Sequence, residues 1–229
     1  STIHKKESLP FSWKTGSKGR SVWTIEDRDS GEVLSRFEAR TLEVVGMSMR
    51  VGLQSMPDRL SFAPRPTGSL DVIARLDLES YVRGVLPSEM PASWPLEALK
   101  AQAIAARTFA LFRKKAREKV NATYDVESDV MDQVYKNPLG VEPLSAKKSE
   151  MVERALRETK GVVLLARGEH PFATFFHADC GGHTEEPGHV WGPSESVGTT
   201  PDESCPTNPM ASWTIRVSPD DVAKKFKSA

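Results

Sequence analysis

A single glutamate, Glu89, stands between two prolines in residues 85–108, VLPSEMPASWPLEALKAQAIAART. Pro87 fixes its own φ, and Pro91 disfavours the α region for the residue before it. We therefore predict a stiff, non-helical segment that holds the Glu89 carboxyl at the start of the helix that follows. A carboxyl that only solubilises a loop needs no such rigidity, so the pattern indicates either acid–base chemistry or a bend that matters in itself.

The residues around Glu89 suit a proton-transfer group. Leu86, Met90 and Trp94 offer apolar neighbours, which disfavour the charged form of a carboxyl, while the positive end of the following helix acts in the opposite direction. The alternative is an exposed loop glutamate, because most charged residues lie in solvent.

Two cations follow on the predicted helix. Lys100 and Arg107 are seven residues apart on one stripe, which separates them by about 10 Å along the helix axis. Arg107 has apolar residues on both sides, so it needs a carboxylate, a carbonyl or a polar ligand as its partner. A structural ion pair with Asp125 or Asp129 and a contact with substrate both satisfy this requirement.

Residues 175–192, FFHADCGGHTEEPGHVWG, form a second concentration of polar groups. Gly181 and Gly182 allow φ > 0 and a close approach of the backbone to a ligand or to another segment. Four side chains in this segment are of types that ligate zinc: His177, Cys180, His183 and His189. Their spacing matches neither a zinc finger nor the HExxH pattern, and each histidine alone is commonly a hydrogen-bonding loop residue. We predict no metal and no other cofactor.

The composition excludes several classes of protein. The 229 residues contain 31 Lys and Arg against 31 Asp and Glu, so the basic excess of a nucleic-acid-binding protein is missing. No run approaches the roughly 18 apolar residues of a transmembrane helix, and we expect no such segment. Cys180 and Cys205 fit one disulfide outside the cytoplasm or two thiols inside it.

The spacing of hydrophobic residues changes along the chain from a strand-like to a helix-like pattern. Short strands are predicted at residues 21–26, 33–39 and 69–76, separated by turn signals. Helices are predicted from Ser93, as N-cap, to about residue 118, then over 145–159, and from Ser218 onward, with a β-hairpin formed by 162–166 and 172–178. Because strands and helices do not alternate as βαβ units, the predicted fold class is α+β. It has mixed short-strand sheets with a long central helix, a second helix and a β-hairpin, in one main domain.

Residues 85–111 resemble the signature of the SpoIID/LytB family, named for stage II sporulation protein D of endospore formers. Three later blocks resemble later motifs of that family in the same order: DQVYKN at 132–137, ETKGVVLL at 158–165, and the block at 175–192. The resemblance implies an N-terminal extension over residues 1–20 and a SpoIID-like domain over 21–229. That domain would be β-rich to about residue 80 and catalytic from about residue 81.

The resemblance also implies a function in peptidoglycan. Enzymes of this family are lytic transglycosylases that cleave glycan strands stripped of their peptides, and their catalytic acid lies in the motif that PSEMP matches, which places it at Glu89. Some members are instead binding modules described as enhancers of cell-wall amidases. Some relatives bind zinc through a histidine and two cysteines after the FFH motif, ligands that this chain replaces in part by histidine.

A lytic transglycosylase needs only one catalytic carboxylate. A glycoside hydrolase ordinarily uses two carboxyl groups, and a second one would come from Asp125, Asp129 or Asp132. In a lytic transglycosylase, the C6 hydroxyl of N-acetylmuramic acid attacks its own ring. Glu89 would protonate the leaving oxygen and then accept the hydroxyl proton, which leaves a 1,6-anhydro end.

The remaining expectations concern ligands and place of action. We predict that the sugars and the lactyl carboxylate contact a set of polar and aromatic positions: Lys100, Arg107, Gln133, Tyr135, His177, Gly181 and Gly182. The expected partners are peptidoglycan glycan strands and, in the alternative function, a cell-wall amidase. The expected location is extracytoplasmic: periplasm, cell envelope or secreted.

Overall fold

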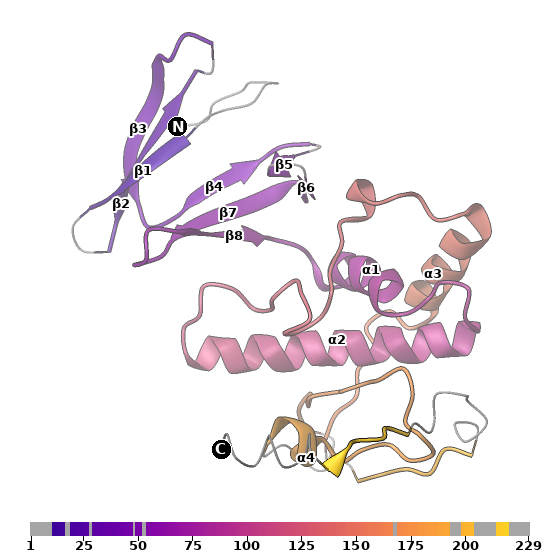
Figure 1. The fold of residues 1–229 in the computed structure, drawn as a ribbon. Helices are drawn as coiled ribbons and strands as arrows, with labels where there is room; N and C mark the ends of the chain where they lie inside the picture. Colours follow the sequence, from indigo (N-terminus) through magenta and orange to yellow (C-terminus); the bar gives the residue numbers. More distant parts are fainter. Residues whose placement is uncertain are drawn as a thin grey trace. The chain divides into compact units, whose positions relative to one another are not determined.

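The computed structural model describes residues 11–16, 19–27, 29–47, 49–51, 54–166, 169–192, 198–203 and 214–219. The chain divides into two compact units, Ser1–Pro171 and Phe172–Ala229, and each is described by itself. The first unit contains antiparallel sheets of short strands followed by helices (Figure 1), so the α+β prediction is confirmed. None of the described helices combines the length and the apolar character that a bilayer crossing needs.

Short antiparallel strands make up the N-terminal part of the first unit. One sheet has the order β1–β2–β3, a second has the order β4–β7–β8, and β5 pairs with β6. The bounds are β1 Phe11–Thr15, β2 Ser21–Glu26, β3 Val33–Ala39, β4 Leu42–Val45, β5 Arg50–Val51, β6 Gln54–Ser55, β7 Arg59–Pro64 and β8 Leu70–Ala74. The three predicted strands therefore correspond to β2, β3 and β8. Residues 11–15, which lie within the expected N-terminal extension, form a strand that pairs with β2.

A separate hydrophobic cluster holds these strands together. Trp23 is fully buried, and it packs with Leu42, Leu60 and Phe62. Its indole N–H donates to the carbonyl of Ala39 at 3.2 Å, so the polar atom of the ring keeps a partner in the core.

The helices carry the other core of the first unit. They are α1 Leu78–Glu89, α2 Leu96–Lys119, the short 3₁₀ helix η1 Pro138–Gly140, and α3 Ala146–Glu158. The two predicted long helices correspond to α2 and α3. Ser93 does not cap α2, which begins after Pro95 without a side-chain cap.

Helix α1 corrects the expectation of a non-helical segment around Glu89. Pro87 lies inside α1, and Glu89 is its last residue. The helix starts at a strong cap, because the Asp77 carboxylate accepts from the backbone N–H of Ser80 at 3.0 Å. Met90 is extended at φ −138° and ψ 135°, as its position before a proline predicts.

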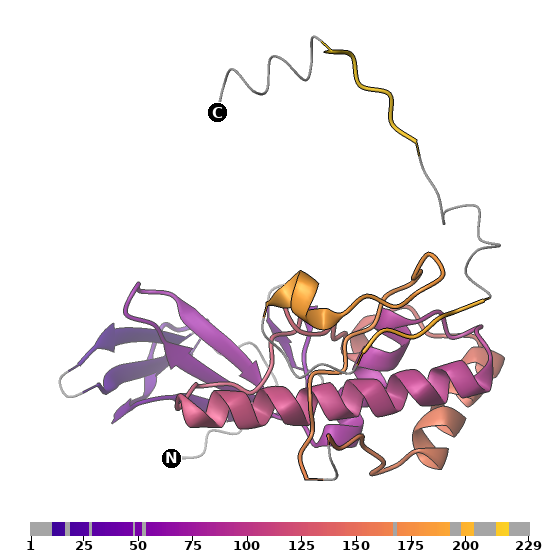
Figure 2. The same ribbon diagram turned by 90° about the horizontal axis from the view of Figure 1, so that it is seen from below.

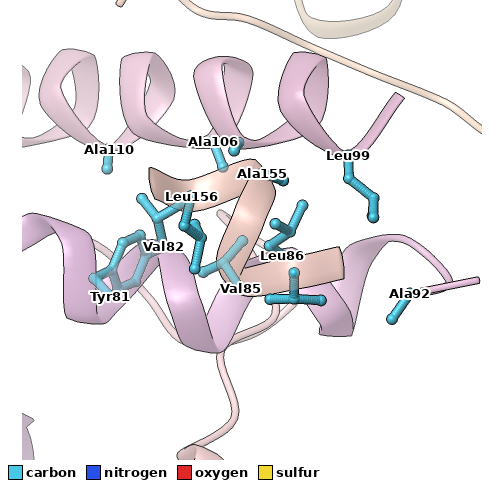
Figure 3. Close-up of a cluster of buried hydrophobic side chains, with 12 residues drawn as sticks. Tyr81, Val82, Val85, Leu86, Ala92, Leu99, Ala106, Ala110, Ala155 and Leu156 are labelled. Atoms are coloured by element: carbon cyan, nitrogen blue, oxygen red, sulfur yellow. The ribbon is translucent and has the colours of Figure 1, made fainter. Parts of the chain in front are cut away.

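Burial explains why α1 forms in spite of its proline. Its inner face carries a stripe at helical spacing, Tyr81, Val82, Val85 and Leu86, which is buried against α2 and α3 (Figure 3). The facing side of α2 presents Leu99, Ala103, Ala106 and Ala110, and the small alanines allow close approach of the helix axes. Helix α2 lies beside α1 and α3 (Figures 1 and 2).

The predicted β-hairpin is not formed. Between residues 162 and 178 the described chain has no strand, only an isolated bridge between Ala166 and His170. Polar groups of α2 take the place of a second strand: the Val162 carbonyl accepts from Arg107 at 3.0 Å, and the Leu164 N–H donates to the Thr108 hydroxyl at 3.0 Å. Backbone groups satisfied in this way no longer need a β-ladder.

Only the start of the predicted C-terminal helix can be compared, since residues 220–229 lie outside the described residues. Pro219, which follows Ser218, is helical.

Arg107 joins three parts of the helical core. Its side chain is fully buried, and its Nε and Nη2 donate to the two carboxylate oxygens of Glu79 in α1 at 2.9 and 2.8 Å. Its Nη1 reaches the carbonyls of Ala103 and Val162. Glu79 also accepts from the backbone N–H of Gly161 at 3.2 Å, so the pair ties α1, α2 and the chain after α3 together. The Arg107 guanidinium, with help from that N–H, lowers the pKa of Glu79.

We expect Glu79→Gln to lower the free energy of unfolding by about 2–4 kcal/mol at neutral pH, because it leaves a buried guanidinium without its counter-charge. A carboxyl whose folded pKa is lowered stabilises the protein above its unfolded pKa, and that contribution is lost as the pH falls through the folded pKa. The difference between wild type and variant should therefore shrink on acidification below about pH 4. Urea unfolding at a series of pH values measures it.

Glu153→Gln is the matched control. The Arg83–Glu153 pair is also bidentate, at 2.8 and 3.1 Å, but both side chains are 44% exposed. Loss of the Arg83–Glu153 pair should lower the free energy of unfolding by less than about 1 kcal/mol. Equal destabilisation by the two variants, or a Glu79→Gln effect that does not change with pH, would contradict the assignment.

Candidate active site

Glu89 lies at the C-terminal end of α1 and is half-buried. Its Oε1 accepts a hydrogen bond from the backbone N–H of Val134 at 2.5 Å. Within the described parts of the chain nothing else donates to this carboxylate, so Oε2 has no protein partner there. A backbone amide thus fixes one oxygen of the carboxyl and leaves the other to meet a ligand.

The expected apolar neighbours of Glu89 differ in burial. Leu86 is fully buried and Met90 packs against the helical core, whereas Trp94 is 43% exposed. The carboxyl therefore stands at the edge of the core, where apolar packing ends and solvent begins.

Gly84 allows residues 133–136 to dock on α1. Its carbonyl accepts from the Lys136 N–H at 3.3 Å and from the Ser88 hydroxyl at 2.8 Å. A Cβ at this position would lie 2.3 Å from a ring carbon of Tyr135 and 2.7 Å from the Lys136 carbonyl oxygen. Only glycine fits so close an approach, and the sequence analysis did not single it out.

Two tyrosines and a glutamine complete the docked surface. The rings of Tyr81 and Tyr135 stack with centroids 5.7 Å apart and planes 7° from parallel. The Tyr81 hydroxyl donates to Oε1 of Gln133 at 3.2 Å. Tyr81 and Gln133 are buried, and Tyr135 is half-buried. The structure thus brings the predicted residues Gln133 and Tyr135 to the same segment that binds Glu89.

The sequence analysis did not select Tyr81 as a site residue, because it did not predict a helix around it. Tyr81 and Gly84 share one face of α1 and Glu89 ends the same helix, so the three meet residues 133–136 only if the segment is helical. Residues 78–89 were not predicted as a helix because of Pro87.

Burial and negative charge keep the two phenols protonated. Burial raises the pKa of Tyr81, and the carboxylates of Asp132 and Glu89 raise it further. Burial also raises the pKa of Tyr135. Both hydroxyls therefore remain neutral hydrogen-bonding groups at physiological pH.

The candidate second carboxylates are engaged elsewhere. Asp132 forms an ion pair with Arg113 at 2.5 Å and accepts from the backbone N–H of Glu127 at 2.8 Å, and its side chain is 1% exposed. Asp125 lies 3.4 Å from Lys114, and Asp129 accepts from the Met131 N–H at 2.9 Å.

Lys100 and Arg107 both have carboxylate partners. Lys100 Nζ lies 2.8 Å from Glu97 and 2.5 Å from Glu158, and these hydrogen bonds raise the pKa of Lys100. Arg107 pairs with Glu79, not with Asp125 or Asp129 as the sequence suggested. Because the Arg107 side chain is fully buried, its contacts are those of a structural residue.

A cavity of about 1030 Å³ borders the docked surface in the first unit. Tyr81 and Tyr135 form part of its wall, together with residues of β8 and α2, whereas Glu89 is not among its lining residues. Two pairs of its charged groups are joined by ion pairs, Arg65 with Asp71 and Lys114 with Asp125.

His177, Gly181 and Gly182 belong to the second unit and are described within it. Both glycines adopt positive φ, 66° and 109°, a conformation that glycine allows. The Gly182 carbonyl accepts from the Asp202 N–H at 2.9 Å, and His183 forms an isolated bridge with Pro201. The close approach that the glycine pair allows is therefore made to another chain segment.

The possible zinc donors do not converge in the described chain. His189 Nδ1 lies 2.9 Å from a carboxylate oxygen of Glu185, and Cys180 Sγ lies 3.5 Å from one of Asp202. No three His, Cys, Asp or Glu side chains gather there as a ligand set. Cys205, which would be the partner of Cys180 in a disulfide, lies outside the described residues.

Comparison with known proteins relates the central part of this chain to one family. The family model SpoIID, described as stage II sporulation protein, matches residues 66–165. An uncharacterised protein of Brachyspira hyodysenteriae is 40% identical over 123 residues, which cover 53% of this chain and 30% of the relative. The amidase enhancer of Bacillus subtilis is 33% identical over 144 residues, covering 63% of this chain and 18% of the relative.

Stage II sporulation protein D of Bacillus subtilis is 34% identical over 125 residues, covering 52% of this chain and 36% of that protein. The chain thus spans about a third or less of the length of these relatives. The matched residues 66–165 include α1 with Glu89, the docked segment at 133–136, and the Arg107–Glu79 pair. The central segment of this chain, residues 66–165, therefore matches the SpoIID family.

Proposed function

We propose that this chain acts on the bacterial cell wall as a lytic transglycosylase that cleaves peptide-stripped glycan strands between N-acetylmuramic acid and N-acetylglucosamine. The observation that supports the proposal best is the Glu89 carboxyl, with Oε1 held by the Val134 N–H and Oε2 without a protein partner in the described chain. This arrangement suits a group that exchanges one proton with a ligand from a fixed position.

Glu89 performs both proton transfers in this mechanism. The protonated carboxyl donates its proton to the glycosidic oxygen as the bond from that oxygen to C1 breaks. The resulting carboxylate accepts the proton of the C6 hydroxyl while that oxygen bonds to C1. The product carries a 1,6-anhydro ring, and the glutamic acid is restored. Because the nucleophile is tethered to the reacting sugar, its effective molarity replaces an oriented water and a second carboxylate.

The docked segment provides the candidate sugar contacts. The amide nitrogen of Gln133 has no hydrogen-bond partner among the described residues, while its oxygen is held by Tyr81. Because Gln133 is only 1% exposed, this donor would reach the acetamido carbonyl of an N-acetylated sugar only after the docked segment moves. The neutral Tyr135 hydroxyl and its ring suit the polar edge and the apolar face of the same sugar.

The second candidate function is a peptidoglycan-binding module that stimulates an amidase. It is favoured by the 33% identity to a protein named amidase enhancer. Such a module requires no acid at position 89, so the two functions differ in their dependence on that carboxyl. Either function requires a location outside the cytoplasm, because peptidoglycan lies there.

We expect Glu89→Gln to lower the rate of glycan cleavage by about 10²–10⁴-fold, the usual contribution of general acid–base catalysis. Glutamine keeps an oxygen that can accept from the Val134 N–H, so the fold should be unchanged. Mass spectrometry of products from denuded glycan strands measures the 1,6-anhydro ends. Glu97→Gln, an 80% exposed glutamate at the start of α2, should retain full activity.

The other possible outcomes of this experiment distinguish between the candidate functions. Full activity of the Glu89→Gln variant would exclude this residue as the acid. Ordinary reducing ends would indicate a hydrolase. Binding to glycan strands without new chain ends, unchanged by Glu89→Gln and accompanied by stimulation of an amidase, would support the binding module.

Gly84→Ala should reduce cleavage by at least about tenfold without loss of helix, because alanine favours a helix by roughly 1 kcal/mol over glycine but collides with Tyr135. The displaced segment would carry the Val134 N–H away from Glu89. Amide hydrogen exchange at Val134 should become faster in the variant, and circular dichroism should remain that of the wild type.

Gly46→Ala serves as the control, since a Cβ there meets only the flexible Met49 side chain at 3.5 and 3.6 Å. Unchanged exchange at Val134 together with normal activity of Gly84→Ala would show that the docked segment does not position Glu89.

A further inference from the structure

An exposed aromatic stack lies in the second unit. The short helix α4, Pro187–Trp191, ends in Trp191, whose ring stacks on Phe175 with centroids 4.0 Å apart and planes 6° from parallel. The Trp191 side chain is nevertheless 56% exposed, whereas Phe175 is half-buried. In a parallel stack the partner covers one face of the indole, so the exposed area includes the other face.

The surroundings of the indole are open. Gly188 lies three residues before Trp191, which puts it on the same side of the helix. It carries no side chain, and a Cβ placed there would meet no atom within 4 Å. Phe175 supports the indole from behind and fixes its orientation, so the flat outer face is presented without further ordering.

The same helix region also carries exposed polar groups. Glu185 and His189 form a pair at 2.9 Å while remaining 59% and 75% exposed. The imidazole lowers the pKa of Glu185, which therefore stays ionised. A flat apolar face on a helix that also carries exposed hydrogen-bonding groups favours a ligand with one apolar face and a polar rim. A pyranose ring has this character, because its C–H groups form a face and its hydroxyls lie around the edge.

We propose that the outer face of Trp191, backed by Phe175, is a binding platform for a pyranose ring of a β-1,4-linked N-acetylhexosamine chain. The identity of this glycan rests on the proposed function, but binding at the platform does not involve the Glu89 carboxyl. A platform of this kind adds affinity for the strand without entering the bond-breaking step. Its loss therefore raises KM and leaves kcat unchanged.

The test uses the chain with Glu89→Gln, so that ligand is not consumed, and chitohexaose and denuded glycan strands as probes. We expect Trp191→Ala to weaken binding by about tenfold in calorimetric titrations, whereas Trp191→Phe, which retains a flat ring, should bind nearly as well as the parent. Trp191→Leu, which keeps apolar bulk but no flat face, should behave like Trp191→Ala. Val190→Ala removes apolar atoms from a side chain that is 56% exposed on the same helix and should have no effect.

Two results would overturn the platform. One is parent-like affinity in Trp191→Ala or Trp191→Leu, with the fold checked by circular dichroism. The other is concentration-dependent self-association of the wild type that Trp191→Ala abolishes while glycan binding persists, which would make the stack a protein contact.

The outcome separates the platform from the proposed function. Binding that depends on Trp191, combined with no new chain ends from the wild type, supports the platform and rejects transglycosylase activity. If the wild type cleaves glycan and Trp191→Ala has the same KM as the wild type, the platform is rejected and the transglycosylase activity is retained.

Discussion

The contact between helix α1 and residues 133–136 is the constraint on which the candidate site depends. It requires that position 84 have no side chain, since even a Cβ would lie 2.3 Å from the Tyr135 ring. With glycine at position 84, three interactions form at the same time. The Lys136 N–H donates to the Gly84 carbonyl, the Val134 N–H donates to Glu89, and Tyr135 stacks on Tyr81. Each supports the others, because all three attach one short segment to the same helix.

This contact could not persist on an unsupported helix. Helix α1 is only 12 residues long and contains a proline, and a helix of that length is marginal in water. Its stability comes from burial of its inner stripe against α2 and α3 and from the Arg107–Glu79 pair, which joins α1 to α2 in the core. A buried ion pair of this kind contributes little net energy compared with an apolar core, but breaking it is costly, so it favours one arrangement of the helices over others.

Parts of the fold and of the site followed from local pattern. Strands β2 and β3, helices α2 and α3, the positive φ of Gly181 and Gly182, and the extended Met90 all reflect preferences that act within a few residues. Helix α1 was missed because Pro87 reads as a breaker, and tertiary burial outweighed that preference. The hairpin after residue 162 was wrong because the backbone groups of Val162 and Leu164 found partners on α2 that no local pattern reveals.

The sequence was sufficient to assign the α+β class, because apolar periodicity is a local property. The choice of Glu89 as the candidate acid, and of Gln133 and Tyr135 as sugar contacts, came from the resemblance of the sequence motifs to the SpoIID/LytB family. Tertiary structure alone decided which groups meet: Glu89 with the Val134 N–H across 45 residues, and Arg107 with Glu79 across 28. Those pairings depend on how three helices pack their buried faces. Several carboxylates and amides in the sequence were equally able to serve as partners, so the choice among them was made by packing.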